Sequence, residues 1–259
     1  MKLWAMAALC AAGVSAAHAQ AGTLYGVATF STFGTQSLYA IDAGTGAASL
    51  IGSTGLRQIM GLDWDGGTGR LMALTAAGDA FALDTGTGAS TLVTDANFGV
   101  SEGSVAYAGG VAFTTIFDNL HTFSGGAWQQ VGPSFLAPGA DISGLDFGGS
   151  QLLGLALNGA GADQLVSFDA LTGAAAVLGA TGTNASTVGG LAHAFLGGAW
   201  YMTDGATLYS LDASTGAATS IGSHGVAGFS GLAFVPAPGT LALAGLCGLG
   251  GRVGSRRRR

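Results

Sequence analysis

The side chains that could take part in acid–base chemistry are few, and they lie between apolar runs. Glu102 and Asp141 carry carboxyl groups that can release or accept a proton, and His224 carries an imidazole that titrates near neutral pH. If the protein is an enzyme, the catalytic set is therefore predicted as Glu102, Asp141 and His224. Such a set would suit a lyase or a hydrolase acting on a secreted substrate.

A wider polar set is predicted to bind a ligand. Arg57 adds a positive charge, while Gln58 and Asn184 add amide groups that can both donate and accept hydrogen bonds. The predicted ligand-binding residues are Arg57, Gln58, Glu102, Asp141, Asn184 and His224. The alternative is that these are solvated loop side chains that do not converge, because they come from several different loops.

No metal site is predicted. The histidines are scattered, and Cys10 and Cys247 lie near the two ends of the chain, so the body lacks cysteine ligands. The stretch from Asp63 to Gly69 resembles the start of a calcium loop, but its twelfth position is Leu74 instead of a carboxylate. We interpret it as a hairpin turn, and calcium is the one cofactor left open. The chain also carries no nucleophile elbow, phosphate-binding loop or dinucleotide fingerprint.

A repeated hairpin must position these side chains. The stretch LYAIDAGTGAASLIG from Leu38 returns from Ala80, Leu165 and Leu208, and a degraded copy with a shorter turn starts at Leu120. Apolar residues at every second position predict strands. The Asp-x-x-Thr-Gly motif predicts the turn between them, because aspartate accepts hydrogen bonds from nearby amides and glycine adopts positive φ freely.

Two further apolar runs accompany each hairpin, which makes a unit of four strands. One run reads GLDW, SVAY, GLDF, GLAH or GLAF, and the other reads, for example, RLMALT. Units of 40 to 45 residues with four strands are typical of the blades of a β-propeller. His193 and His121 fall at positions that other units fill with aromatic residues, so both are expected to be structural. His224 has no such counterpart.

The ends of the array predict a closed ring. The chain enters the repeats at residues 24–29, which match a second strand, and leaves at residues 231–234, which match a first strand. The last strand can therefore complete the first blade and remove the exposed sheet edges. The predicted fold is all-β, a five-bladed β-propeller over residues 20–235. A β-sandwich or an open β-solenoid is the alternative.

The composition limits the partners of this body. Only 8% of the residues are charged, and residues 20–235 contain Arg57 and Arg70 against all fourteen acidic residues. An acidic body argues against nucleic acid and anionic membrane surfaces as partners. Neutral or basic ligands and divalent cations remain compatible with it.

Residues 1–19 are interpreted as a secretory signal peptide. Lys2 supplies the positive start, residues 3–14 form a short apolar core, and Ala17-His18-Ala19 is a small-x-small cleavage site. The chain is therefore expected to be exported.

The last residues, 236–259, form a separate tail. Val235, Pro236, Pro238 and Gly239 precede an apolar run over residues 240–251, and Arg256, Arg257, Arg258 and Arg259 end the chain. This order resembles the PEP-CTERM sorting tail of Gram-negative bacteria, with Ala237 where that family usually has glutamate. The resemblance implies a short apolar helix, recognition by an exosortase-type protease, and sorting to the cell surface or matrix. The run is short for a membrane span, which favours a transient inner-membrane anchor over a permanent one.

These observations favour a non-enzymatic function. We expect an exported propeller, sorted to the surface or matrix, that binds extracellular polysaccharide or an envelope protein. The alternative is a secreted propeller lyase or hydrolase with an acid–base site at the mouth of the central channel. A purely structural spacer is a third possibility. The ligand and the oligomeric state do not follow from the sequence.

Overall fold

The computed structural model describes the repeat region with short gaps. The described residues are 22–28, 34–96, 99, 104–116, 118–136, 141–158, 161–184, 189–195 and 197–238. The predicted signal peptide, the apolar run of the tail and its arginines lie outside them. Within the described residues, no helix has the length and apolar character needed to cross a membrane.

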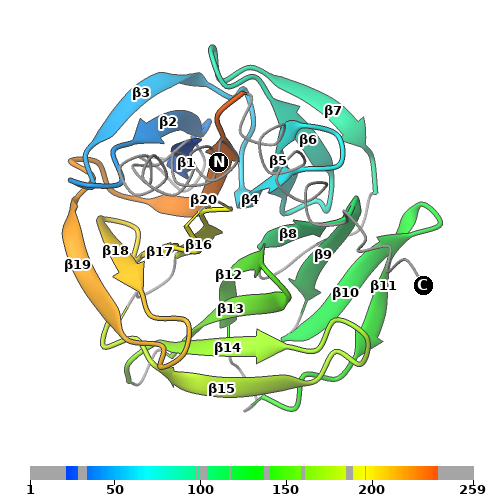
Figure 1. Ribbon diagram of the computed structural model, residues 1–259. Coiled ribbons are helices and arrows are strands. Elements are labelled where there is room, and N and C mark those ends of the chain that lie inside the picture. Colours follow the sequence, from blue (N-terminus) through cyan, green and yellow to red (C-terminus); the bar gives the residue numbers. More distant parts are fainter. Residues whose placement is uncertain are drawn as a thin grey trace, which may run out of the picture.

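Five four-stranded antiparallel sheets are arranged as blades around a central axis (Figure 1). From the centre outward, blade 1 contains β20 (Phe229–Pro236), β1 (Gly22–Ala28), β2 (Ser37–Ile41) and β3 (Ala48–Ser53). Blade 2 contains β4 (Ile59–Asp65), β5 (Arg70–Thr75), β6 (Ala80–Leu83) and β7 (Ser90–Thr94). Blade 3 contains β8 (Val105–Ala108), β9 (Val111–Ile116), β10 (Asn119–Ser124) and β11 (Ala127–Gly132). Blade 4 contains β12 (Asp141–Gly148), β13 (Gln151–Leu157), β14 (Gln164–Phe168) and β15 (Ala175–Ala180). Blade 5 contains β16 (Gly190–His193), β17 (Trp200–Thr203), β18 (Thr207–Leu211) and β19 (Ala218–Ser223).

The ring closes as the sequence predicts. Strand β20 from the end of the described chain pairs antiparallel with β1 from its start, and their register runs from Gly22 opposite Pro236 to Ala28 opposite Phe229. Blade 1 is therefore built from both ends of the repeat region (Figure 1). The predicted five-bladed β-propeller is confirmed, and neither the β-sandwich nor the open solenoid describes the fold.

The hairpin turns follow the predicted chemistry. Asp84 Oδ1 accepts hydrogen bonds from the amides of Gly86 at 3.0 Å and Thr87 at 2.8 Å. Gly88 closes the turn with φ of +79° and donates its amide to the Asp84 carbonyl at 2.8 Å. Hydrogen bonding to the ionised carboxylate lowers the pKa of Asp84. The turns that start at Asp42, Asp169 and Asp212 are built in the same way.

Neighbouring blades meet at their outer ends through glycine. A Cβ atom added to Gly52, near the end of β3, would lie 2.2 Å from the carbonyl oxygen of Thr87 in the turn of blade 2. Only glycine allows the two backbones to approach so closely. We call this contact a joint. The other joints are made by Gly132 with Thr172, Gly179 with Thr215, and Gly222 with Thr45.

Apolar side chains between the blades form the core. The cluster between blades 1 and 5 includes Leu24, Tyr39, Tyr201 and Phe229, all buried. Burial of such side chains supplies the main driving force for folding. The smallest cluster of the described residues lies mainly between blades 2 and 3, with five buried members: Leu74, Val105, Ala112, Ile116 and Trp128.

Candidate functional site

The residues predicted to bind a ligand are spread around the ring. Arg57 and Gln58 are exposed in the segment between β3 and β4, where Gln58 has a φ of +53°. Asn184 is exposed after β15, and Glu102 lies outside the described residues. Asp141 begins β12 in blade 4 and is half-buried. Its pKa is raised by burial and then by the negative charge of Asp118.

His224 is part of a joint instead of a solvent-exposed loop. Its side chain is 1% exposed, its Nε2 is 2.9 Å from Thr203 Oγ1, and its Nδ1 is 2.9 Å from the carbonyl oxygen of Gly46. The ring also packs on Phe229 with centroids 4.4 Å apart. Burial lowers the pKa of His224, so the imidazole is held neutral.

The expectation that His224 has no counterpart is corrected by its position. It stands two residues after the joint glycine Gly222, and the same place is filled by buried hydroxyl residues at three other blades: Thr54, Ser134 and Thr181. The carbonyl of His224 accepts a hydrogen bond from Ala48 of blade 1 at 3.1 Å. Nδ1 and the carbonyl of His224 thus connect blade 5 to blade 1, while Nε2 contacts Thr203 within blade 5.

The other two histidines of the described residues lie in the positions expected for aromatic residues. His193 packs at a tilt on Trp200 with centroids 4.6 Å apart. His121 is buried in β10, with Nδ1 2.9 Å from the carbonyl oxygen of Asn119. Burial lowers the pKa of both imidazoles.

Two buried aspartates connect the inner strands. Asp63 on β4 accepts a hydrogen bond from the amide of Tyr107 in blade 3 at 2.6 Å. Asp146 on β12 accepts one from the amide of His193 in blade 5. Each also accepts the amide of its own following residue. Blades 3, 5 and 1 have alanine at the equivalent positions: Ala106, Ala192 and Ala233.

Burial raises the pKa of both carboxyl groups. The pKa of Asp146 is raised to about 7, chiefly because burial disfavours its charge. The pKa of Asp63 is raised well above its usual range by burial and, second, by the charge of Asp146. Both carboxyl groups border the mouth of the central channel.

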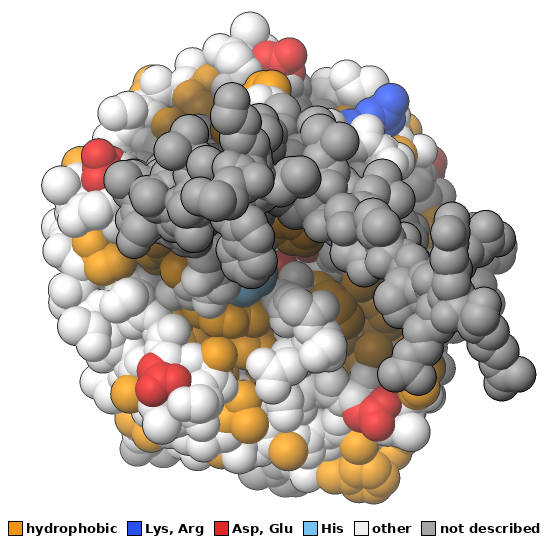
Figure 2. All heavy atoms as spheres, viewed as in Figure 1, with side chains coloured by type: hydrophobic (Ala, Val, Ile, Leu, Met, Phe, Trp, Pro, Cys, Tyr) orange, Lys and Arg blue, Asp and Glu red, His pale blue; other side chains and the backbone are white. Residues whose placement is uncertain are grey.

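A pocket of about 480 Å³ lies at the channel mouth beside these aspartates. Its rim carries the turns between first and second strands, so it opens on the face opposite the predicted ligand-binding loops. It is lined by the residues that occupy the aromatic position near the end of each blade's first strand: Trp64, Tyr107, Phe147, His193 and Phe234. Phe195 stands at its edge with 58% of its surface exposed, and Trp64 Nε1 is buried with no hydrogen-bond partner among the described residues. In the space-filling view, hydrophobic side chains surround the hollow at the centre where it is uncovered, and acidic side chains are spaced around the outer edge of the molecule (Figure 2).

The described residues contain no group of three or more histidine, cysteine or acidic side chains placed to hold a metal ion. The stretch that resembles a calcium loop is a turn between β4 and β5. Asp65 Oδ1 accepts the amide of Gly67 at 2.9 Å, and Asp65 Oδ2 accepts the hydroxyl of Thr68 at 2.6 Å. Both carboxylate oxygens therefore serve the turn, as the sequence interpretation predicts.

A second cavity of about 170 Å³ lies between blades 2 and 3, which we call the blade 2–3 cleft. Here the joint is missing on both sides. In β7, Thr94 pairs with Ala80 of β6. The other fourth strands have the joint glycine at this position. The turn of blade 3 is reduced to Gly125 and Gly126, with φ of +63° and +85°.

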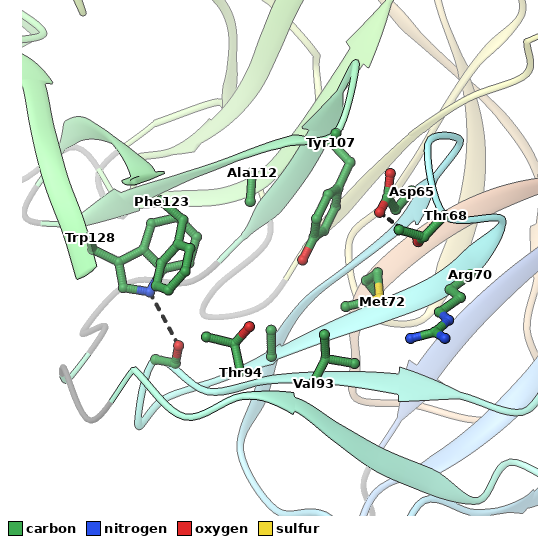
Figure 3. Close-up of a pocket in the computed structure, with 13 residues that line it drawn as sticks. Asp65, Thr68, Arg70, Met72, Val93, Thr94, Tyr107, Ala112, Phe123 and Trp128 are labelled. Atoms are coloured by element: carbon green, nitrogen blue, oxygen red, sulfur yellow. Dashed lines mark hydrogen bonds between the residues drawn. The ribbon is translucent and has the colours of Figure 1, made fainter. Parts of the chain in front are cut away.

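The walls of this cleft come from both blades (Figure 3). Phe123 and Trp128 of blade 3 pack edge to face at 5.2 Å, and Trp128 Nε1 donates a hydrogen bond to the carbonyl of Gly78 in blade 2 at 3.2 Å. Tyr107 points its hydroxyl into the space between this aromatic pair and Arg70 (Figure 3).

Sequence reasoning did not find either cavity as a site. The sequence predicted only that His193 takes the place of an aromatic residue in a structural role, and only the closed ring brings that position of all five blades to one rim. The missing joint leaves two signals in the sequence, Thr94 in place of glycine and the shortened turn after Phe123. These two signals indicate a single cleft only when one knows that the fourth strand of each blade contacts the hairpin turn of the following blade.

Comparison with known proteins supports the fold alone. No family model and no curated protein matches the chain. Among solved structures, a chain of the nidogen/laminin complex matches with a TM-score of 0.55 and 12% identity, over 83% of this chain and 99% of that chain. TolB from Acinetobacter baumannii matches with a TM-score of 0.49 and 12% identity, over 83% of this chain and 54% of that one. A 6-phosphogluconolactonase candidate from Bacteroides fragilis matches with a TM-score of 0.49 and 11% identity, over 83% and 98%. At these identities the first match shows a shared β-propeller architecture, and a fold carries no function by itself.

Proposed function

We propose that this chain is an exported β-propeller that binds extracellular polysaccharide without catalysing a reaction. An envelope protein is the other partner that the same surface could bind. The proposal combines the sequence prediction of export and sorting with the chemistry of the channel-mouth pocket.

The aromatic rim of the channel-mouth pocket is the observation that carries the proposal. Pyranose rings present C–H faces that pack on aromatic rings, while their hydroxyl groups form hydrogen bonds with donors and acceptors around them. The rim offers the exposed ring of Phe195, and the buried indole N–H of Trp64 in the pocket wall has no hydrogen-bond partner among the described residues. Concave, mostly apolar pockets with a few polar groups are the usual sites for small ligands and sugar units.

The aspartates beside the rim suit a structural role. Each of Asp63 and Asp146 accepts two backbone amides, one from its own strand and one from the neighbouring blade. A carboxylate engaged in this way holds the inner strands together. His224 is likewise engaged at both ring nitrogens.

The raised pKa values of Asp63 and Asp146 favour the second candidate function, a secreted lyase or hydrolase. Acid–base catalysis at neutral pH uses carboxyl groups with pKa values near 7. This candidate requires that Asp146→Asn abolish turnover of a polysaccharide while leaving binding intact.

The location of the protein rests on its two terminal segments. Residues 1–19 would direct export, and the tail over residues 236–259 would hold the chain in the inner membrane until an exosortase-type protease acts. The propeller would then reach the cell surface or the matrix. Pro236 lines the channel-mouth pocket, so the tail starts beside the proposed binding surface.

Co-sedimentation tests the proposal. The purified full-length chain is mixed with the exopolysaccharide of the producing organism, with and without calcium, and the bound fraction is measured. We expect saturable binding that Phe195→Ala weakens by about fivefold or more, because truncating a residue central to a binding surface costs about 1 kcal/mol or more. Phe135→Ala is the matched control, since Phe135 is 79% exposed and does not line the pocket. Absence of binding in both conditions would refute the polysaccharide ligand.

A further inference from the structure

The junction between blades 2 and 3 differs from the other junctions on both of its sides. Where the other fourth strands carry a glycine, blade 2 carries Thr94, and where the other blades carry an Asp-x-x-Thr-Gly turn, blade 3 carries Gly125 and Gly126. A Cβ atom at any of the four joint glycines would lie 2.0 to 2.2 Å from a carbonyl oxygen of the next blade. The side chain of Thr94 is therefore compatible with this fold only because the facing turn is shortened.

The space that results is held open by ordered contacts. At the inner end, Asp63 accepts the amide of Tyr107 and fixes blade 3 against blade 2. At the outer end, Trp128 Nε1 donates to the carbonyl of Gly78 and spans the same two blades. The blade 2–3 cleft is thus a cavity with fixed walls, which lowers the entropic cost of binding a ligand there.

Two polar groups in the cleft are not used by the described part of the protein. No hydrogen bond or ion pair engages the guanidinium of Arg70, or the hydroxyl of Tyr107, within that part. Arg70 lies beside Met72 at one end of the cleft, and the Tyr107 hydroxyl lies near its middle (Figure 3). Asp65 lines the same end, but its two oxygens are engaged by Gly67 and Thr68.

We propose that the blade 2–3 cleft binds a sugar unit that carries a carboxylate, such as a uronic acid. The aromatic wall of Phe123 and Trp128 would pack on the C–H face of the ring, the hydroxyl of Tyr107 would hydrogen-bond to a ring substituent, and Arg70 would pair with the carboxylate. Arginine suits this role because its planar fork matches the two oxygens of a carboxylate. The volume of about 170 Å³ fits one small ring-sized group, below the roughly 300–1,000 Å³ of pockets for larger ligands.

The choice of a sugar rests on the polysaccharide-binding function proposed above, whereas the anionic group rests on Arg70 alone. The propeller body is acidic, and one of its two arginines lies at this cavity. Acidic side chains elsewhere on the body repel an anion, so an anionic ligand should bind preferentially beside Arg70. The cleft is separate from the channel-mouth pocket, although Tyr107 borders both. A polymer could therefore contact the protein at two places.

Calorimetric titration of the full-length chain with glucuronate, glucose and benzoate tests this inference. We expect glucuronate to bind more tightly than glucose or benzoate. Arg70→Ala should weaken glucuronate binding by about tenfold or more, because the carboxylate loses a charged hydrogen-bond donor. Arg57→Ala is the matched control, since Arg57 is the other arginine of the body and lies outside both cavities. Tyr107→Phe removes only the hydroxyl and should weaken glucuronate by a smaller factor.

The outcomes separate this inference from the proposed function. If Arg70→Ala binds glucuronate as tightly as the unaltered chain, or if glucose or benzoate binds as tightly as glucuronate, the inference is wrong, even where the polysaccharide co-sediments. If glucuronate binding depends on Arg70 but no polysaccharide binds, the cleft takes the free sugar acid and the polysaccharide-binding function is wrong. Circular dichroism of each variant confirms that a loss of binding reflects the site and not unfolding.

Discussion

Replacing a joint glycine should destabilise the ring, and Gly132→Ala is the sharpest case. A Cβ atom there would lie 2.0 Å from the carbonyl oxygen of Thr172, whereas ordinary contact begins at 3.4 Å. Blades 3 and 4 would have to separate locally by about 1.4 Å, and the partner is backbone, which cannot rotate away. Overpacking of this kind costs about 1–3 kcal/mol.

The sign of the change in stability on Gly→Ala substitution distinguishes a joint from an ordinary strand position. Gly132 does not have a positive φ, and at such a position Gly→Ala would otherwise stabilise a protein by about 0.4–1 kcal/mol. Thr94→Ala is the matched control, because Thr94 holds the corresponding place in blade 2 and faces the cavity beside the shortened turn of blade 3. It should change stability by no more than about 0.5 kcal/mol.

Thermal and urea unfolding followed by circular dichroism measure both variants. For a domain of this size, about 1 kcal/mol shifts the midpoint temperature by roughly 2–4 °C, so Gly132→Ala should unfold several degrees lower. If Gly132→Ala is as stable as the unaltered chain, or more stable, the close approach at the joints is not what holds the blades together. A large loss in Thr94→Ala would equally contradict the absence of a joint between blades 2 and 3.

Three other predictions follow from the same structure. The pKa of Asp146 is raised to about 7 in the folded state, so the folded protein binds more protons than the unfolded chain, and the free energy of unfolding should fall as pH rises from about 4 to about 7. Urea unfolding across this range should show that fall, and Asp146→Asn should flatten it. Asp84→Ala should lower the thermal midpoint because the turn loses its acceptor, whereas Asp95→Ala, in an exposed segment, should not. Ending the chain before Phe229 removes β20 and leaves β1 as an open edge, so cooperative unfolding should be lost, while ending it after Pro238 should preserve it.

The fold was predictable because its signals are local and repeated. The turn at Asp84 is specified by three residue types within five positions, and it forms the same hydrogen bonds wherever the motif recurs. Closure was predictable because the first and last strands of the array match complementary members of one unit. Each of these inferences needs only neighbouring residues and the repeat spacing.

The sites were harder to predict because they depend on which blades meet. Phe195 and Trp64 are far apart in sequence and share a pocket only because β16 and β4 both face the central channel. The role of His224 was hidden because the residues in its place at other joints are threonine and serine. The roles predicted for the signal peptide and the tail stay predictions, since those segments lie outside the described residues.

The central claim is that the propeller binds a polysaccharide and leaves it intact. Size-exclusion chromatography with light scattering, applied to the full-length chain incubated with the exopolysaccharide of the producing organism, measures binding and cleavage together. The account predicts that the protein elutes with the polymer and that the molar mass of the polymer, once the protein is removed, is unchanged. A polymer mass that falls with time would show catalysis, and a protein that elutes only at its free position would show no binding; either result would contradict the claim.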